Sequence, residues 1–184
     1  MKGTPGQGTV SSALMPNVST LQSWYAVHTH SRHENKVAAG LAEKSVTTFL
    51  PTVRQLHNWS DRRKIVEVPV FPCYVFVRVQ QWKQVHSLVL RTPGVFRWVG
   101  QTGEPTVIPD SQIDAVRSAV ATDLSVSLHP FLKEGQRVRI CSGSLEGVEG
   151  ILVGKNKDCK LVISIDLLQQ SIAVALEGYD VVAA

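Results

Sequence analysis

Cysteine is scarce in this chain of 184 residues, and its three cysteines do not form an obvious pair. Cys73, Cys141 and Cys159 are widely spaced and include no C-x-x-C pair. An odd number at such spacing argues against a disulfide framework and against a zinc knuckle. The pattern fits the reducing cytoplasm, so we expect a cytoplasmic protein without a metal or other cofactor.

Long apolar runs are also lacking near the start of the chain. Residues 1–20 are rich in Gly, Ser, Thr and Pro, contain one Lys, and have no apolar run long enough for a signal peptide or a membrane span. We therefore expect a disordered tail over 1–20 and no membrane partner.

The sequence has no recognisable reactive constellation. Nothing resembles a nucleophile elbow, a phosphate loop or a paired-carboxylate site. His28, His30 and His33 have the spacing of a partial metal triad, but no cysteine or carboxylate completes a tetrahedral set. We expect no catalytic residues, no metal site and no enzymatic activity.

What is present is a globular composition with a mild basic excess. The hydrophobic fraction is 43%, the charged fraction is 18%, and the net charge is +4. Such a chain suits two small domains and is not a disordered polypeptide. The charge permits contact with a polyanion without demonstrating it. We expect a monomer.

The first part of the chain predicts a sheet with helices. Residues 24–29 predict a strand, and Ser31 with Glu34 predicts a capping box that starts a helix running to about Lys44. A strand is expected over 46–50. Further predicted elements are a long hairpin over 53–68 turning near Ser60 and Asp61, a strand over 71–79, a short helix containing Trp82, Val85 and Val89, a strand over 95–99, and a helix opening at Pro109.

The strand predicted over 71–79 is apolar on both faces. Its odd positions are all apolar, while Tyr74, Phe76 and Arg78 occupy the other face. One face of an antiparallel sheet normally meets water. Tyr74 and Phe76 must therefore be covered by a further element or belong to an exposed patch that binds a partner.

A glycine-punctuated segment near the C-terminus has the pattern of a KOW motif. Residues 137–140 alternate polar and apolar side chains, and glycines then permit a tight connection into a second strand. The glycines of the motif are Gly135, Gly143, Gly147 and Gly150. We expect them to serve chain geometry in a small barrel with strands near 137–140, 150–155, 160–167, 171–176 and 179–182. Residues 125–133 contain Pro130 and no clear period, which predicts a linker.

These features together resemble the NusG family. The segments that carry the resemblance are Trp24–Val27, Phe71–Val77, Thr92–Val95 and the KOW motif. The resemblance covers residues 22–184 and implies an α+β chain. Its domains would be an NGN-type antiparallel sheet flanked by helices over 21–124, a linker over 125–133, and an SH3-like KOW barrel over 134–184. The tracts at 49–51, 59–64 and 68–72 are more similar to the specialised RfaH and UpxY type.

The resemblance implies an apolar surface that receives the clamp helices of RNA polymerase. The residues that match it are Phe71, Pro72, Tyr74 and Phe76, with simple core packing as the alternative. An aromatic patch that carries one polar group, the hydroxyl of Tyr74, has the composition of an interface hot spot. Cys73 stands where the family often has Gly or Asn. His86 falls near a short polar motif that, in the RfaH type, touches the opposing lobe.

Basic residues on two elements predict contact with nucleic acid. Arg54, Arg62, Arg63 and Lys64 lie on or near the hairpin beside His57 and Trp59, which suits phosphates and an unstacked base, although a solvated turn is the alternative. In the specialised relatives the first helix and its approach read non-template DNA. By this resemblance the carriers here are His30, Arg32, Lys36 and Lys44.

The expected function is transcription elongation or antitermination with increased processivity, on selected operons. Partners of the KOW domain would be ribosomal protein NusE or the termination factor Rho, contacted through exposed apolar residues such as Leu145, Ile151 or Leu167. Two alternatives stay open: a general NusG acting with Rho or in pausing, and a ribosome-binding or RNA-binding KOW protein.

Overall fold

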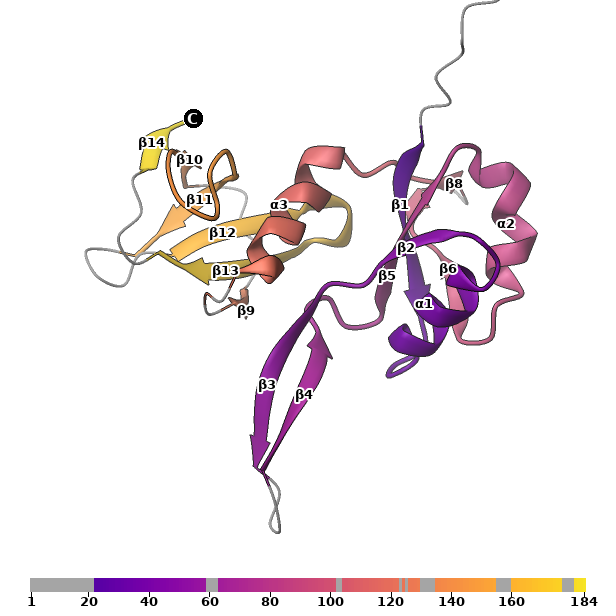
Figure 1. Cartoon of the computed structure of the whole chain (residues 1–184). Coiled ribbons are helices and arrows are strands. Elements are labelled where there is room, and N and C mark those ends of the chain that lie inside the picture. Colours follow the sequence, from indigo (N-terminus) through magenta and orange to yellow (C-terminus); the bar gives the residue numbers. More distant parts are fainter. Residues whose placement is uncertain are drawn as a thin grey trace, which may run out of the picture.

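The computed structural model describes residues 22–58, 63–101, 104–122, 124, 126–129, 135–154, 160–176 and 181–184. The first part of the chain contains β1 (Ser23–Thr29), α1 (Glu34–Ala42), β2 (Thr47–Phe49), β3 (Thr52–Asn58), β4 (Arg63–Pro69), β5 (Tyr74–Val79), α2 (Trp82–Leu90), β6 (Val95–Trp98), β7 (Gly100–Gln101), β8 (Glu104–Pro105) and α3 (Asp110–Ala121). The second part contains β9 (Val126–His129), β10 (Gln136–Ile140), β11 (Glu149–Val153), β12 (Lys160–Ile165), β13 (Gln170–Ala175) and β14 (Val181–Ala183). This is the expected α+β arrangement of a sheet with helices followed by an all-β part (Figure 1).

The first sheet is antiparallel in the order β2-β5-β1-β6, and helices pack on both of its faces. On one face Trp24, Ala26 and Phe76 join residues of α3 in the core. On the other face the alternate residues of β1 and β5 pack against α1 and α2. Both faces of the sheet are covered, which explains why β5 is apolar on both sides. Phe76 is therefore covered by a further element and does not belong to an exposed patch.

The hairpin of β3 and β4 projects from the sheet, away from α3 (Figure 1). Its strands pair from Thr52 with Pro69 to Asn58 with Arg63, in agreement with the predicted hairpin. Residues 59–62, which hold the expected turn, lie outside the described residues. Ile65 on β4 is 63% exposed, so the hairpin presents apolar as well as charged surface.

The start of α1 differs from the predicted capping box. The helix begins at Glu34, no side chain caps it, and the Nδ1 atom of His33 lies 3.0 Å from the carbonyl oxygen of Ser31. Arg32 has a φ of 62°, which turns the chain between Ser31 and the helix. Glu34 instead accepts a hydrogen bond of 2.8 Å from the backbone N–H of Cys73. The helix also ends at Ala42, earlier than expected.

Cys73 occupies a backbone conformation that favours glycine. Its φ is 67°, in the left-handed region, where a Cβ atom costs about 1–2 kcal/mol. The residue immediately precedes β5, so this turn sets the position at which Tyr74 enters the sheet.

Replacing Cys73 by glycine is therefore expected to stabilise the protein. We predict that Cys73→Gly raises the free energy of unfolding by about 1 kcal/mol, and the thermal midpoint by about 2–4 °C, because glycine adopts this φ without steric cost. Differential scanning calorimetry measures both changes. Cys73→Ala is the matched control, because it removes the thiol and keeps the Cβ. An equal gain in the two variants would show that the thiol, not the backbone, is the source of the effect.

The second sheet is antiparallel in the order β14-β10-β11-β12-β13-β9. Five of its strands lie close to the predicted ranges, and its core contains Val138, Ile140, Leu161, Ile163 and Ile172. The predicted linker needs a correction, because residues 126–129 form β9 and pair with β13. The sheet thus begins inside the segment expected to be a linker. Within the described part of the chain, the helices are too short or too polar to cross a bilayer.

Candidate functional site

A chain of aromatic and imidazole rings crosses three elements at one end of the first sheet. Tyr74 of β5 lies 5.1 Å from His28 of β1, measured between ring centroids, and His28 lies 5.5 Å from Phe96 of β6. Phe96 lies 5.8 Å from His30, which is 6.0 Å from His33. We call these five residues the aromatic row. Its three histidines are those with the spacing of a partial metal triad in the sequence, and the structure places them in contact with aromatic rings.

Strand register explains how residues so distant in sequence meet. His28 pairs directly with Tyr74 on one side of β1 and with Arg97 on the other. The register of β1 and β6 shifts between His28 and Thr29, and such irregularities re-aim side chains. Phe96 lies on the edge strand β6 and is 58% exposed. A large exposed aromatic side chain next to half-buried rings is typical of a surface that binds a partner.

His28 at the centre of the row is held towards its neutral form. Burial lowers the pKa of its imidazole, and the positive charges of Arg97 and His30 lower it further. Its Nδ1 atom is buried and has no hydrogen-bond partner among the described residues. At neutral pH the centre of the aromatic row is therefore an uncharged ring between Tyr74 and Phe96, which favours contact with an apolar partner surface.

The residues that match the family's polymerase surface divide into core and surface. Phe71 and Phe76 are 1% and 0% exposed, and their rings pack edge to face at 5.8 Å. Tyr74 is half-buried in the aromatic row, and Pro72 is exposed beside it. In this conformation the two phenylalanines support the surface from below, while Tyr74 and Pro72 form part of it.

His86 lies elsewhere, on α2. Its ring stacks on Trp98 at 6.3 Å and contacts Trp82 edge to face at 5.4 Å. Its Nδ1 and the Nε1 of Trp98 are buried, and the described part of the chain gives neither atom a hydrogen-bond partner. Among the described residues, no ring contact connects His86 with the aromatic row. It belongs to a separate ring cluster with Trp82 and Trp98.

The basic residues predicted around α1 are mostly free to reach a ligand. Arg32 and Lys36 are exposed, and His30 is exposed within the aromatic row. Lys44 is already engaged, because its ammonium donates to the hydroxyl of Thr92 at 2.7 Å and to the carbonyl of Leu88 at 3.4 Å. A ligand that used Lys44 would compete with these contacts between the end of α1 and α2.

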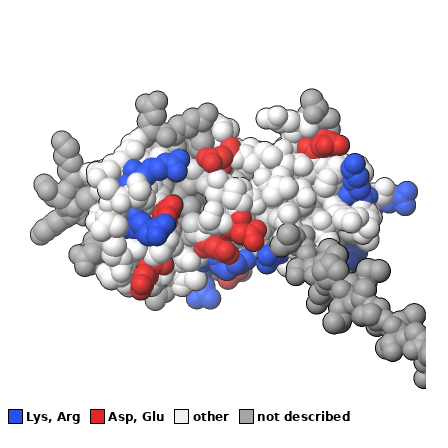
Figure 2. All heavy atoms as spheres, turned by 90° about the horizontal axis from the view of Figure 1, so that it is seen from above, with Lys and Arg blue, Asp and Glu red and all other residues white. Residues whose placement is uncertain are grey.

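The basic residues of the hairpin are only partly described. Arg54 is exposed and forms a long ion pair with Glu67 at 3.9 Å, which contributes little in water. Arg63 and Lys64 belong to β4, but their side chains, like the whole of Arg62, lie outside the described residues. Lys and Arg are interspersed with Asp and Glu on the face seen from above (Figure 2), so this view shows no field of a single sign.

The glycines of the KOW motif are positioned for chain geometry. Gly147 has a φ of 81°, and Gly135 and Gly143 also have positive φ. At Gly150 a Cβ atom would lie 2.6 Å from the carbonyl oxygen of Val162, which excludes any side chain without movement of β12. These observations agree with the geometric role that the sequence favours.

The apolar residues expected to contact a KOW partner need a correction. Leu145 is 0% exposed and Ile151 is 7% exposed, so neither is an exposed contact as expected, and Leu167 is half-buried. Leu145 packs in the core of the second sheet.

Sequence reasoning missed His28 and Phe96 as parts of the candidate surface. The alternation of β1 carries a signal for His28, because it places this residue on the side of Trp24 and Ala26, directly opposite Tyr74 in the register. No comparable signal identifies Phe96, since its contact with His28 depends on the shifted register between β1 and β6.

Comparisons with known proteins agree with this architecture. A family model described as transcription termination factor NusG matches residues 22–117. The transcription termination/antitermination protein NusG of Lactococcus lactis is 27% identical over 183 residues, covering 89% of this chain and 94% of the relative. The protein of the same name from Bacillus subtilis is 26% identical over 170 residues, covering 85% and 95%. These names describe transcription factors, not enzymes.

A solved structure titled "Domain interaction in Thermotoga maritima NusG" shares the fold. It matches with a TM-score of 0.50 and 22% identity, covering 84% of this chain and 93% of that one. Because the family model spans more than half of the sequence and begins with β1, which holds the centre of the first sheet, the chain belongs to the NusG family.

Proposed function

We propose that this protein is a transcription elongation and antitermination factor that docks on the clamp of RNA polymerase through the aromatic row. The observation that carries the proposal is the continuous series of ring contacts from Tyr74 through His28 to Phe96, which forms an aromatic surface in which Phe96 is 58% exposed. Rigid aromatic side chains give a large contact area at low entropic cost, as in interface hot spots. Membership of the NusG family supports the same partner.

The proposed mechanism is a shift of population. A factor that binds the closed, active clamp more tightly than the paused state disfavours pausing in proportion to the difference in affinity. A coupling of about 1–3 kcal/mol is enough for a 5-fold to 150-fold effect. Contact of His86 with the opposing lobe would let the protein bridge the DNA channel and would add to this difference.

We further propose that the exposed cations near the row follow the non-template DNA strand. Arg32 and Lys36 are exposed on the same approach as His30, and aromatic rings beside cations suit an unstacked base. Arg54 and the described part of the hairpin extend away from the sheet, which gives a second route to phosphates (Figure 1). The second domain would tether NusE or Rho, raising the local concentration of that machine.

Gel-shift binding to reconstituted elongation complexes tests this proposal. The complexes carry the leader of the protein's neighbouring operon or a scrambled leader. Tyr74→Ala is expected to weaken binding about tenfold, because it removes the tyrosine ring at the end of the row. Gln84→Ala, on an exposed turn of α2, is the matched control and should bind as the wild type does.

The leader comparison separates the remaining alternatives. Selective binding to the native leader supports a specialised antitermination factor, and equal binding to both leaders supports a general NusG. Absence of binding to any complex, together with tight binding to RNA, would overturn the polymerase proposal in favour of a ribosome-binding or RNA-binding protein.

A further inference from the structure

His28 lies between two aromatic rings of the aromatic row. Its ring centroid is 5.1 Å from that of Tyr74 on β5, at an interplanar angle of 36°, and 5.5 Å from that of Phe96 on β6, at 81°. Among the described residues, Tyr74 and Phe96 share no ring contact of their own, so the row is continuous only through His28. A movement of this one imidazole would therefore separate the two rings of the proposed docking surface.

A bulge in β6 brings a positive charge to the same imidazole. His28 pairs with Arg97, whereas Thr29 pairs with Val95, so Phe96 is an extra residue without a register partner on β1. Such an extra residue re-aims the side chains around it. Phe96 contacts the imidazole here, while the charge of Arg97 acts on it. Arg97 is exposed and forms no ion pair with a described residue, so no described carboxylate neutralises its charge.

The surroundings of His28 favour the neutral imidazole over the charged one. A neutral imidazole carries one proton, which can reside on Nε2, whereas an imidazolium carries a proton on each nitrogen. Because the Nδ1 atom is buried without a described partner, protonation would create a buried N–H donor that has no acceptor. Rotation of the side chain towards water would give this donor a partner, but the rotation would break both ring contacts.

The charged and titratable groups around His28 add to this preference. They are the phenol of Tyr74 on β5, the guanidinium of Arg97 on β6, His30 on β1 and, one ring further along the row, His33 before α1. No described carboxylate forms an ion pair with His28. Burial, the charge of Arg97 and the charge of His30 lower the pKa of His28 below its ordinary value of 6.5.

We propose that His28 is a protonation switch within the aromatic row. While the imidazole is neutral, the row forms one continuous surface from Tyr74 to Phe96. When the imidazole gains a proton, its side chain turns towards water and the surface separates into isolated rings. The consequence for polymerase binding rests on the proposed function, whereas the switch itself is a property of the free protein.

The pH range of the switch follows from the sign of the pKa shift. Enclosure in the row lowers the pKa of His28, so the released side chain binds its proton more tightly than the enclosed one. The stabilisation that His28 gives to the row is therefore complete above pH 6.5. It is lost as the pH falls through the lowered pKa of the enclosed ring.

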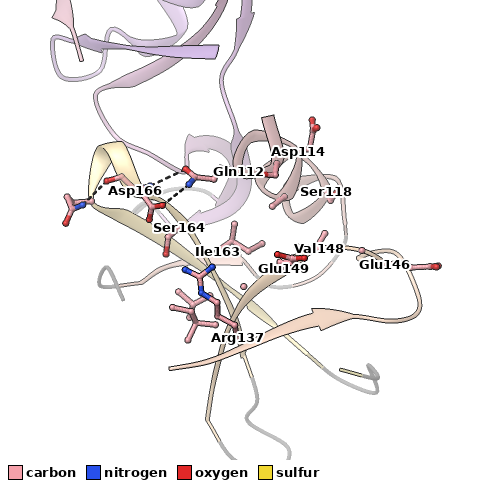
Figure 3. A pocket seen from close by; sticks show the side chains of 17 residues that line it. Gln112, Asp114, Ser118, Arg137, Glu146, Val148, Glu149, Ile163, Ser164 and Asp166 are labelled. Carbon is pink, nitrogen blue, oxygen red and sulfur yellow. Dashed lines mark hydrogen bonds between the residues drawn. The ribbon is translucent and has the colours of Figure 1, made fainter. Parts of the chain in front are cut away.

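Several carboxylates that also titrate in acid lie at a different place. A cleft of about 900 Å³ between α3 and the second sheet is lined by residues that include Asp114, Glu146, Glu149 and Asp166 (Figure 3). No residue of the aromatic row lines this cleft. Protonation of these carboxylates can therefore be followed separately from protonation of His28.

Nuclear Overhauser effects in the full-length protein test the switch without a partner. We expect contacts from the His28 ring to the rings of Tyr74 and Phe96 at about pH 7.5, and their loss as the imidazole titrates below about pH 6.5. The contact between the buried rings of Phe71 and Phe76 should persist, which shows that the first domain is still folded. Retention of both His28 contacts after protonation, as a favourable cation–π interaction would produce, overturns the inference.

Two arginine variants test the origin of the pH dependence. Arg97→Gln removes one of the charges that act on His28 and is expected to move the midpoint of the imidazole titration to higher pH. Arg91→Gln is the matched control, because Arg91 is also exposed but is not among the charges that act on His28. Its midpoint should equal that of the wild type. An unchanged midpoint in Arg97→Gln would overturn the inference.

Gel-shift binding to elongation complexes measures the consequence for docking. Below the midpoint of the His28 titration the wild type is expected to bind about tenfold more weakly than at about pH 7.5, because protonation removes a ring from the row. His28→Gln carries a neutral side chain that does not titrate, so it reports the pH dependence of the polymerase itself. Equal pH dependence in the two proteins overturns the inference and leaves the proposed function intact. Absence of binding at any pH overturns the proposed function, and the Overhauser contacts then decide the switch by themselves.

Discussion

Phe76→Ala is expected to lower the free energy of unfolding of the first domain by about 3–5 kcal/mol. The side chain is 0% exposed, contacts Phe71 edge to face at 5.8 Å, and stacks on Phe49 at 6.1 Å. Its removal leaves a cavity under α3 that fixed neighbours on β2 and β5 cannot fill. Phe96→Ala removes a ring of the same size that is 58% exposed, so its expected cost is within about 0.5 kcal/mol.

Urea unfolding followed by tryptophan fluorescence measures the difference in unfolding free energy between Phe76→Ala and Phe96→Ala in the first domain. All four tryptophans precede residue 99, so the signal reports on the first domain alone. Phe76→Leu is an intermediate control, because it retains most of the buried volume. Similar losses in Phe76→Ala and Phe96→Ala would contradict the division of this segment into a supporting core and an exposed row.

The two-domain architecture could be predicted because it depends on local periodicity. The alternation in β5 separates Phe76 from Val75 and Val77, and the structure places these residues in the two cores on opposite faces of the sheet. The 3.6-residue spacing of Ile113 and Val116 likewise predicts the buried side of α3. Such periodicity can be recognised without knowing which segment packs against the strand or helix.

What covers each face could not be predicted from periodicity. The segment around Phe71 and Phe76 looks the same in sequence whether α3 lies over it or not, and α3 begins only at Asp110. The same limitation applies to residues 126–129, whose pairing with β13 joins segments more than 40 positions apart. Local composition indicates a linker there, but long-range hydrogen bonds to β13 make these residues the strand β9.

The candidate surface was predictable in part for a similar reason. The aromatic composition of the segment around Tyr74 and the family resemblance both indicate this residue. His28 and Phe96 join it only through the register of β1 with β5 and β6. The failed capping box is a third example, because the side chain of Glu34 finds a donor 39 positions away in place of the one expected at Ser31. In each case a long-range contact overrides a local pattern.

Glu34→Ala is expected to lower the free energy of unfolding by about 2–3 kcal/mol. Glu34 is only 6% exposed, and its carboxylate accepts a hydrogen bond of 2.8 Å from the N–H of Cys73. Hydrogen bonds to charged groups contribute about 1.5–3 kcal/mol, and loss of the acceptor leaves a partly buried N–H without a partner. Its position in the first turn of α1 also places the negative charge at the favourable end of the helix dipole.

Tryptophan fluorescence during urea unfolding measures this loss as well. Glu43→Ala, at the exposed end of the same helix, is the matched control and should change stability by less than about 0.5 kcal/mol. Glu34→Gln keeps an acceptor oxygen without the charge. Its loss of unfolding free energy should therefore lie between those of Glu43→Ala and Glu34→Ala. A loss in Glu34→Gln as large as that in Glu34→Ala would mean that the charge, not the acceptor, provides the stabilisation.

The same carboxylate is expected to hold the strained turn at Cys73 in place. If it does, the two positions are coupled, because glycine adopts a φ of 67° without support whereas cysteine requires it. Glu34→Ala should then cost about 1 kcal/mol less in a Cys73→Gly background than in the wild type. Strict additivity of the two substitutions would show that the bond stabilises α1 without controlling the turn. Coupling would mean that a buried carboxylate of α1 fixes the backbone from which Tyr74 enters the aromatic row, so that Glu34→Ala should also weaken binding to elongation complexes in the gel-shift measurement.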